Sequence, residues 1–147
     1  MKTKIFIIVL FTAVFGLASQ AQAQDVLRFT DVVQTNGNVK ARIYTPKSVT
    51  VRFMLVSNFG SSNNTGLSLT YKIGPRQIIH PWEYLNHTGN KTEYATITLY
   101  PGWNDVHCYF YTGIGDNINP YGYVYMLSVE SGNAVIGSPS YIYFCKQ

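Results

Sequence analysis

Hydrophobic and polar side chains alternate along two neighbouring stretches of the chain. The first runs from Val49 until Asn58 and Gly60 interrupt it, and Leu67–Gly74 repeats the same arrangement. The positions that share one face are Val49, Val51, Phe53 and Leu55 in the first stretch, and Leu67, Leu69, Tyr71 and Ile73 in the second. A period of two with β-branched and aromatic residues indicates antiparallel strands with one buried face. The pattern therefore predicts a half-buried β-sheet.

Strand-like segments recur along the rest of the chain, each bounded by glycine, proline or asparagine. No segment has the period of an amphipathic helix. A hairpin turn is expected at Asn36-Gly37 and a tight turn at Pro101-Gly102, because these residue pairs suit such turns. The expected strands are Val26–Gln34, Val39–Tyr44, Ser48–Ser57, Leu67–Ile73, a weak one at Arg76–His80, Ala95–Leu99, Val106–Tyr111, Tyr121–Val129 and Tyr141–Cys145.

Short strands without helices predict an all-β fold, an antiparallel β-sandwich of seven to eight strands. A closed barrel is the structural alternative that the sequence leaves open. The 147-residue chain is long enough for one domain with one hydrophobic core and too short for two domains of typical size.

Residues 1–23 have the composition of a secretory signal peptide. A positive n-region at Lys2 and Lys4 precedes a short apolar run and the small-residue cleavage site Ala21-Gln-Ala23. The apolar run is shorter than the roughly 20 residues that span a bilayer, and a retained anchor helix is the alternative. We expect a single mature domain, residues 24–147, that is secreted, periplasmic or at the cell surface, with no membrane span. Loss of the two lysines would lower the formal net charge from +4 to +2.

Cys108 and Cys145 are the only two cysteines in the sequence. An even number in an exported protein suggests a disulfide. Closing this loop would stabilise the fold by about 4 kcal/mol in the chain-entropy model. We therefore expect a bridge between Cys108 and Cys145, with two separate buried thiols as the alternative.

Several of these segments together resemble the bacterial cell-adhesion-related domain, CARDB. They are Val49–Gly60, the strand that ends in Gly74, Ile97-Thr-Leu-Tyr-Pro-Gly102, the strand Val106–Phe110, and Gly122–Val129. The resemblance covers nearly the whole expected mature chain. It implies an immunoglobulin-like, fibronectin-III-like sandwich of the kind found in secreted and surface proteins, and a role in adhesion.

The sequence offers no strong metal site. His80 and His87 are seven residues apart with Glu83 between them, and His107 is expected on an outer strand face. Solvated loop histidines are the simpler interpretation of the first two. The loop Asp116-Asn117-Ile118-Asn119 offers alternate oxygen ligands, but no glutamate follows at the spacing of an EF-hand. Calcium binding there stays open, and we expect no metal and no cofactor.

Catalytic motifs are also missing from the sequence. It contains no Gly-x-Ser-x-Gly elbow and no phosphate-binding loop. Its acids fall mostly at turns, and Glu83 with Glu93 is the one pair that we considered for glycoside hydrolysis. We therefore expect no enzyme, and a small secreted hydrolase is disfavoured. Basic residues occur singly along the chain, which argues against a nucleic-acid partner.

Aromatic residues, 15% of the sequence, carry the best binding hypothesis. Both tryptophans lie in turn-like contexts, where a large ring need not be interior, and exposed rings can stack on sugars or anchor a protein interface. The alternative is that the aromatics fill the core and rim of a small sandwich. The candidate binding residues are Trp82, Tyr84, Trp103, Tyr109 and Tyr111, and Tyr100, Tyr121, Tyr123 and Tyr125 could extend such a surface.

These observations predict a secreted or cell-surface, non-catalytic β-sandwich module for adhesion or protein interaction. The alternative is a carbohydrate-binding module that uses surface aromatics. An exposed, coplanar row of rings would favour a glycan partner, and dispersed rings would favour a protein. The sequence identifies neither the partner nor the oligomeric state.

Overall fold

The computed structural model describes residues 22–58, 67–74, 78–84, 90–111 and 119–147, with the backbone alone for 67–68, 78–84, 90–91 and 111. Within these ranges every regular element is a strand, and no helix is long and apolar enough to cross a membrane. The strands are β1 (Asp25–Leu27), β2 (Thr30–Thr35), β3 (Asn38–Thr45), β4 (Val49–Asn58), β5 (Leu67–Ile73), β6 (Ile78–Tyr84), β7 (Asn90–Leu99), β8 (Gly102–Tyr111), β9 (Tyr121–Ser131), β10 (Ala134–Ile136) and β11 (Tyr141–Cys145).

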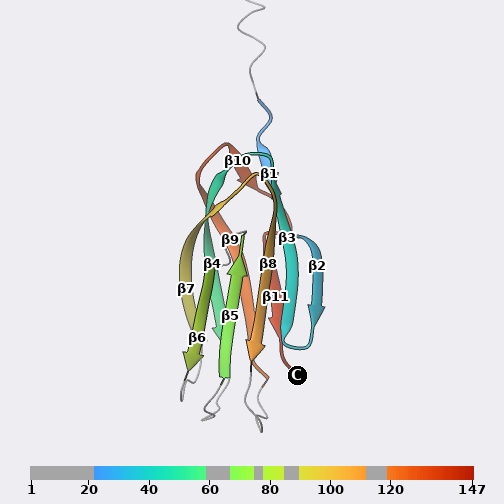
Figure 1. Cartoon of the computed structure of the whole chain (residues 1–147), viewed down its shortest axis with the longest axis vertical. Helices are drawn as coiled ribbons and strands as arrows, with labels where there is room; N and C mark the ends of the chain where they lie inside the picture. Colours follow the sequence, from blue (N-terminus) through green and yellow to red (C-terminus); the bar gives the residue numbers. More distant parts are fainter. Residues whose placement is uncertain (1–21, 59–66, 75–77, 85–89, 112–118) are drawn as a thin grey trace, which may run out of the picture.

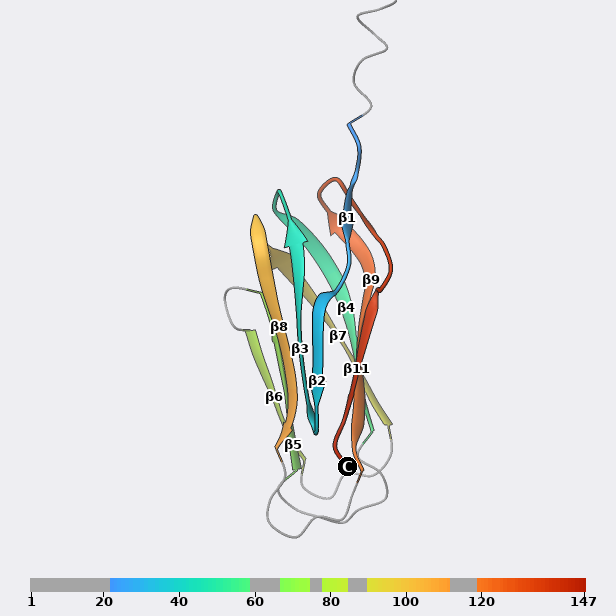
Figure 2. The same ribbon diagram turned by 90° about the vertical axis from the view of Figure 1, so that its right-hand side faces the viewer.

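Two antiparallel sheets pack face to face and form a β-sandwich (Figures 1 and 2). One sheet has the strand order β11-β9-β4-β7, and the other has the order β2-β3-β8-β5-β6. The short strands β1 and β10 form a parallel pair at one end, next to the first described residues. The predicted all-β sandwich is confirmed. In the described part of the chain no strand belongs to both large sheets, so the fold is not a closed barrel.

The core lies between the two sheets and is built from the alternation that the sequence shows. Its β4 and β5 members are Val49, Val51, Phe53, Leu55, Leu69, Tyr71 and Ile73, all at most 2% exposed. Of the outward positions between them that are described, Arg52 is solvent-exposed and the others are partly buried or, at Thr70, buried. Fully burying one large apolar side chain stabilises a fold by about 1.5–3 kcal/mol. The predicted inward faces of these two strands are therefore confirmed at every described side chain.

The first predicted strand is divided in two by the structure. β1 pairs with β10 in parallel, whereas β2 pairs with β3 of the five-stranded sheet. Between them Phe29 enters the core with 1% exposure, and its N–H donates to the Pro139 carbonyl at 3.0 Å. The structure describes eleven strands, more than the seven or eight predicted, and the short strands β1 and β10 account for two of them.

The predicted disulfide between Cys108 and Cys145 is not formed. Cys108 lies on β8 with its side chain fully buried between the sheets. On β11, Ile142 and Phe144 are buried, so the alternation along a strand directs Cys145 to the outer face of the other sheet. A bridge would require β11 to turn over, which would move Phe144 out of the core. Cys108 instead fits the alternative interpretation of the sequence, a separate buried thiol.

Because the two thiols have different surroundings, a maleimide reagent is expected to modify Cys145 in the folded protein and to leave Cys108 unmodified. Cys108 is 0% exposed, and its burial raises the pKa of its thiol, so little reactive thiolate forms. Peptide mapping by mass spectrometry under non-reducing conditions tests this. Recovery of a disulfide-linked peptide that contains both cysteines would contradict it.

A buried asparagine braces the turn that carries the chain from one sheet to the other between β7 and β8. Asn104 is 1% exposed. Its Nδ2 donates to the carbonyls of Tyr100 at 2.9 Å, Gly102 at 3.2 Å and Ile43 at 3.4 Å. Its Oδ1 accepts from the Tyr100 N–H at 3.1 Å. One side chain thus ties the turn to itself and to β3.

Replacing Asn104 with alanine is expected to lower the free energy of unfolding by about 2–3 kcal/mol, because buried backbone groups lose their partners. Urea unfolding followed by circular dichroism measures the change. Thr96→Ala, at an exposed position of β7, is the control and should stay within about 0.5 kcal/mol. Equal stabilities of the two variants would show that the bonds of Asn104 contribute nothing.

Candidate functional site

Strand β9 places three tyrosines on the outer face of the four-stranded sheet. Its first six residues alternate between half-buried and buried side chains. Val124 and Met126 point into the core, at 0% and 4% exposure. Because a strand alternates its side chains between the two faces, Tyr121, Tyr123 and Tyr125 point outward.

The neighbouring strand β11 adds two more tyrosines to the same surface. In the register of the two strands, Tyr141 lies opposite Tyr125 and Tyr143 lies opposite Tyr123. Ile142, between them, is buried in the core. We call this outer surface the tyrosine face, and its members are Tyr121, Tyr123, Tyr125, Tyr141 and Tyr143.

The rings of the tyrosine face contact one another as a continuous array. Tyr125 stacks on Tyr141 with centroids 5.2 Å apart and on Tyr123 with centroids 5.7 Å apart, at interplanar angles of 27° and 26°. Tyr143 packs against Tyr123 at 5.0 Å, and Tyr121 meets Tyr123 edge-on at 6.0 Å. Each such aromatic pair contributes about 0.5–1.5 kcal/mol beyond area burial. The rings therefore hold each other in place before any ligand arrives.

A glycine beneath the array lets β9 and β11 pack closely. Gly122 lies opposite Phe144 in the register, and a Cβ atom at Gly122 would lie only 2.6 Å from Phe144 Cζ. Phe144 fills that space and packs against Phe110 and Tyr71 of the other sheet, with ring centroids 5.0 and 6.0 Å away. The absence of a side chain at Gly122 thus anchors β11 to the core.

The end of the chain is tied to the β2–β3 turn of the opposite sheet. Asn36 Nδ2 donates to the Gln147 carbonyl at 2.9 Å, and the Gln147 N–H donates to Asn36 Oδ1 at 2.7 Å. The Gly37 N–H also donates to the Cys145 carbonyl. We call these three bonds the terminal clasp. They hold β11, an edge strand, in position against the rest of the sandwich.

Two phenols of the tyrosine face, those of Tyr125 and Tyr143, have raised pKa values. A side-chain hydrogen bond with Cys145, together with burial and nearby phenols, raises the pKa of Tyr143 to about 12. Burial, then the neighbouring Tyr123 and Tyr141, raises the pKa of Tyr125. The O–H groups of Tyr125 and Tyr143 can each donate and accept a hydrogen bond.

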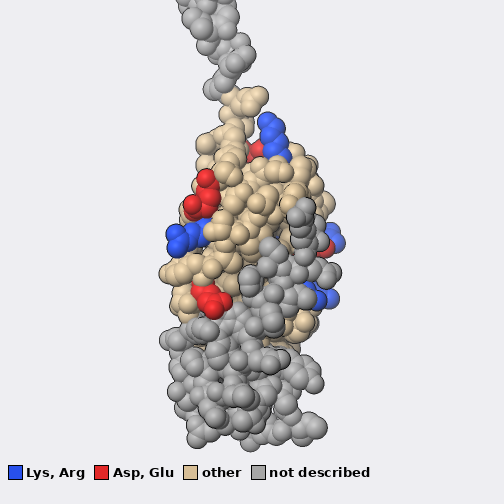
Figure 3. All heavy atoms as spheres, turned by 60° about the vertical axis from the view of Figure 1, so that its left-hand side comes forward, with Lys and Arg blue, Asp and Glu red and all other residues tan. Residues whose placement is uncertain are grey.

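Strands β4 and β7 extend this outer surface. Met54 and Val56 lie opposite Tyr125 and Tyr123 across the β4–β9 pairing, and both are partly buried. Tyr94 on β7 is 57% exposed, and the Arg52 guanidinium lies 4.9 Å from the centroid of its ring. On the face drawn in Figure 3, the charged side chains of the described residues lie in small groups, some with a basic residue beside an acidic one, between uncharged residues.

The structure separates the binding residues that the sequence predicts. Trp103 and Tyr109 lie on the outer face of the five-stranded sheet, away from the tyrosine face. Trp103 is 55% exposed and packs on Tyr44 at a centroid distance of 5.2 Å. Trp82 and Tyr84 are paired with β5, and Tyr111 ends β8, but these three side chains lie outside the described residues.

The sequence predicts Tyr121, Tyr123 and Tyr125 as an extension of the binding surface, whereas Tyr141 and Tyr143 are not among the predicted residues. The signal that could have found them is the matching alternation in Tyr-Gly-Tyr-Val-Tyr and Tyr-Ile-Tyr. Both segments carry tyrosine at every second position, which predicts a tyrosine-lined outer face if they pair.

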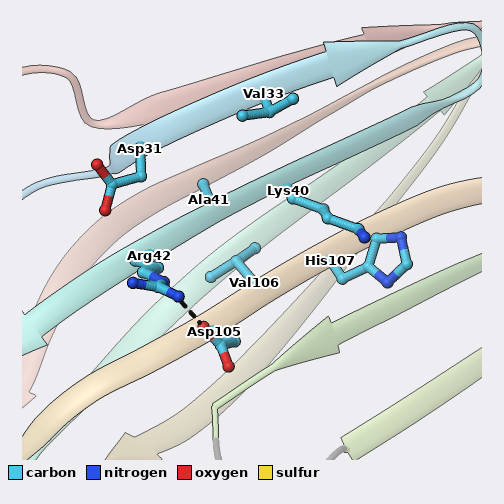
Figure 4. A pocket seen from close by; sticks show the side chains of 8 residues that line it. All are labelled: Asp31, Val33, Lys40, Ala41, Arg42, Asp105, Val106 and His107. Carbon is cyan, nitrogen blue, oxygen red and sulfur yellow. Dashed lines mark ion pairs between the residues drawn. The ribbon is translucent and has the colours of Figure 1, made fainter.

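A shallow groove of about 470 Å³ crosses the outer face of β2, β3 and β8 (Figure 4). Arg42 and Asp105 form an ion pair across it, with Nε and Oδ1 3.3 Å apart. Lys40 and His107 lie side by side on the next pair of positions, and Asp31 faces the groove from β2. An ion pair as exposed as this one contributes at most about 1 kcal/mol to stability.

The candidate metal site and the candidate calcium loop that the sequence offers lie largely outside the described residues. Nothing is described of the side chains of His80, Glu83 and His87, or of the calcium loop before Asn119. In the part that the structure does describe, no three His, Cys, Asp or Glu residues gather where they could hold a metal ion. The metal and calcium interpretations therefore both stay untested.

The sequence matches no protein-family model and no curated protein. Among solved structures the chain is similar to the CBM35 from Cellvibrio japonicus Abf62, at 18% sequence identity and a TM-score of 0.40, over 79% of this chain and 96% of that one. It is also similar to AvmM, which catalyzes macrocyclization in alchivemycin A biosynthesis, at 10% identity and a TM-score of 0.33, over 85% of each chain. The N-terminal domain of PorA matches at 7% identity and a TM-score of 0.33, over 85% of this chain and 87% of that one. At these values the comparisons assign neither a family nor a function, and the CARDB resemblance stays a prediction.

The raised pKa of Tyr143 predicts a loss of stability at alkaline pH. The folded protein keeps this phenol protonated until about pH 12, whereas the unfolded chain ionises it near its ordinary value of 10. The contribution of Tyr143 to stability is therefore full below pH 10 and is lost between pH 10 and 12. Urea midpoints measured across this range should fall less steeply in Tyr143→Phe than in the unmodified protein, with Tyr94→Phe as the matched control. Parallel curves for Tyr143→Phe and the unmodified protein would contradict the expected shift.

Proposed function

We propose that this protein is a non-catalytic binding module that holds a neutral glycan on the tyrosine face. The observation that carries the proposal is the continuous array of five tyrosine rings on two paired strands, with centroids 5.0–6.3 Å apart. The carbohydrate-binding alternative of the sequence analysis is thus retained, but on a different set of residues.

A tyrosine side chain can contact both the apolar face and the polar rim of a sugar ring. The C–H groups on one face of a pyranose pack on an aromatic ring, and the hydroxyls at its rim exchange hydrogen bonds with phenol O–H groups. Tyrosine also gives a large contact area for little conformational entropy, since it has only two side-chain torsions. The mutual packing of Tyr123, Tyr125 and Tyr141 lowers that cost further, because the rings are already ordered.

The uncharged character of the site favours a neutral ligand. Tyr125 and Tyr143, whose pKa values are raised and not lowered, are bordered by the uncharged, partly buried side chains of Met54 and Val56. A protein partner is the competing occupant. Strong protein interfaces usually place aromatic anchors in pockets, whereas this array lies on the surface of a sheet.

Adhesion, the role implied by the CARDB resemblance, is compatible with this proposal, because a module that binds surface glycans can attach one cell or protein to another. Export through the signal peptide of residues 1–23 would bring the domain to such glycans. The adhesive role and the export are both part of what we propose.

A glycan array followed by calorimetry on the best neutral ligand tests the function. Tyr125→Ala and Tyr141→Ala should each weaken binding about five- to tenfold, because a lost aromatic stacking contact costs roughly 1–1.4 kcal/mol. Tyr125→Phe should retain most of the affinity, since it keeps the ring. Tyr44→Ala, an exposed tyrosine on the opposite sheet, is the matched control and should bind normally.

Circular dichroism of each variant confirms that the sheet is intact. Absence of binding above background on a broad array of neutral glycans would reject the proposal. Equal affinity of Tyr125→Ala, Tyr141→Ala and the Tyr44→Ala control would reject the tyrosine face as the site.

A further inference from the structure

Three potentially cationic side chains lie directly opposite one another on the five-stranded sheet. His107 on β8 is paired with Lys40 on β3 and with Lys72 on β5. All three occupy outward positions, because their neighbours Ala41, Val106 and Ile73 are among the core residues of these strands. We call Lys40, His107 and Lys72 the cationic row.

The cationic row is unfavourable for folding by itself. Like charges directly opposite each other on a sheet face destabilise it. Protonation of His107 would place a third positive charge between the two lysines, and partial burial and then the charges of Lys40 and Lys72 accordingly lower the pKa of His107. An anion that lies between the ammonium groups of Lys40 and Lys72 would stabilise the cationic row.

The acidic groups around the row do not supply that anion. Asp105, on the adjacent position of β8, is already paired with Arg42. Asp31 faces the groove from β2, on the far side of β3 from β8. Among the described residues no acid forms an ion pair with Lys40 or Lys72.

The row is held in a fixed geometry. His107 Nε2 lies 2.9 Å from Asn38 Oδ1, and its ring packs on Tyr109 at a centroid distance of 4.8 Å. The Lys72 ammonium lies 5.8 Å from the centroid of the same Tyr109 ring. With Nε2 donating to Asn38, Nδ1 is the nitrogen that gains a proton and becomes a further donor to an anion.

Exposed aromatic rings flank the row along the same strand face. Trp103 packs on Tyr44 four residues before His107, and Tyr109 follows two residues after it. From Trp103 to Tyr109 the strand extends roughly 20 Å, which is longer than a single sugar unit. The groove of about 470 Å³ follows the part of this face between β2 and β8. Rings beside cations suit a saccharide chain that carries acidic groups.

We propose that the cationic row and its flanking aromatic rings form a second binding site, for an acidic polysaccharide whose carboxylate or sulfate groups lie between Lys40 and Lys72. Lysine ammonium groups bind either oxyanion as point charges, so the shared chemistry is a negatively charged oxygen group on a sugar. This site is on the opposite sheet from the tyrosine face and does not depend on it.

Calorimetry at low salt with polygalacturonate, with dextran sulfate and with neutral dextran tests the site and separates the two sources of charge. Binding of one or both acidic polymers is expected to depend on Lys40 and Lys72, whereas any binding of dextran should be the same with and without these two lysines. Lys40→Gln and Lys72→Gln should each weaken binding about two- to fivefold, and the double variant roughly tenfold. Lys47→Gln, an exposed lysine between β3 and β4, is the matched control and should bind normally.

Two further readouts separate binding from a structural role. The variants Lys40→Gln and Lys72→Gln should melt at the same or a higher temperature than the unmodified protein, because each removes a like-charge contact. Affinity should rise as pH falls from about 7 to 5, since protonated His107 adds a positive charge while the acidic groups stay ionised. His107→Asn should abolish that rise.

The inference fails if neither acidic polymer binds at low salt, or if the double variant and Lys47→Gln bind equally well. Tyr125→Ala should leave acidic binding unchanged. If Tyr125→Ala loses neutral-glycan binding and keeps acidic binding, the tyrosine face and the second site are separate sites.

Discussion

The strict alternation of side chains across each strand connects the interior of this protein with its surface. Val124 and Met126 are buried because they are apolar, and their burial forces the adjacent Tyr123 and Tyr125 to face outward. A shift of one residue in the pairing of β9 would expose the apolar side chains and bury the phenols. The packing between the sheets therefore also determines which side chains the protein presents to a ligand.

Much of the fold could be predicted from the sequence, because local alternation is visible in it. The strands around Phe53 and Leu69 and their inward faces are confirmed. What the sequence does not show is which strands become neighbours. Tyr141 and Tyr143 join Tyr123 and Tyr125 only through the pairing of β9 with β11, which depends on packing between distant segments. The same non-local geometry directs Cys145 away from Cys108, so an argument from cysteine number alone predicted a bridge that the strand faces do not allow.

The two outer faces of the sandwich differ in chemistry although both contain tyrosine. The four-stranded sheet gathers uncharged rings, whereas the five-stranded sheet interleaves Trp103 and Tyr109 with charged residues. Because charged residues make up only 12% of the sequence, the concentration of Lys40, Arg42 and Lys72 on one face is a property of the fold and not of the composition. A rigid scaffold with two dissimilar faces can hold two parts of one extended ligand, or two ligands at once.

The terminal clasp has a consequence for how the domain opens. An edge strand would ordinarily open before the inner strands of its sheet, and β11 carries two of the five rings of the tyrosine face. Since Asn36 and Gly37 bind residues 145 and 147, β11 cannot detach without breaking bonds to the β2–β3 hairpin. The amide hydrogens of β11 and of that hairpin should then exchange with solvent as one cooperative unit, although the two segments lie at opposite ends of the sequence.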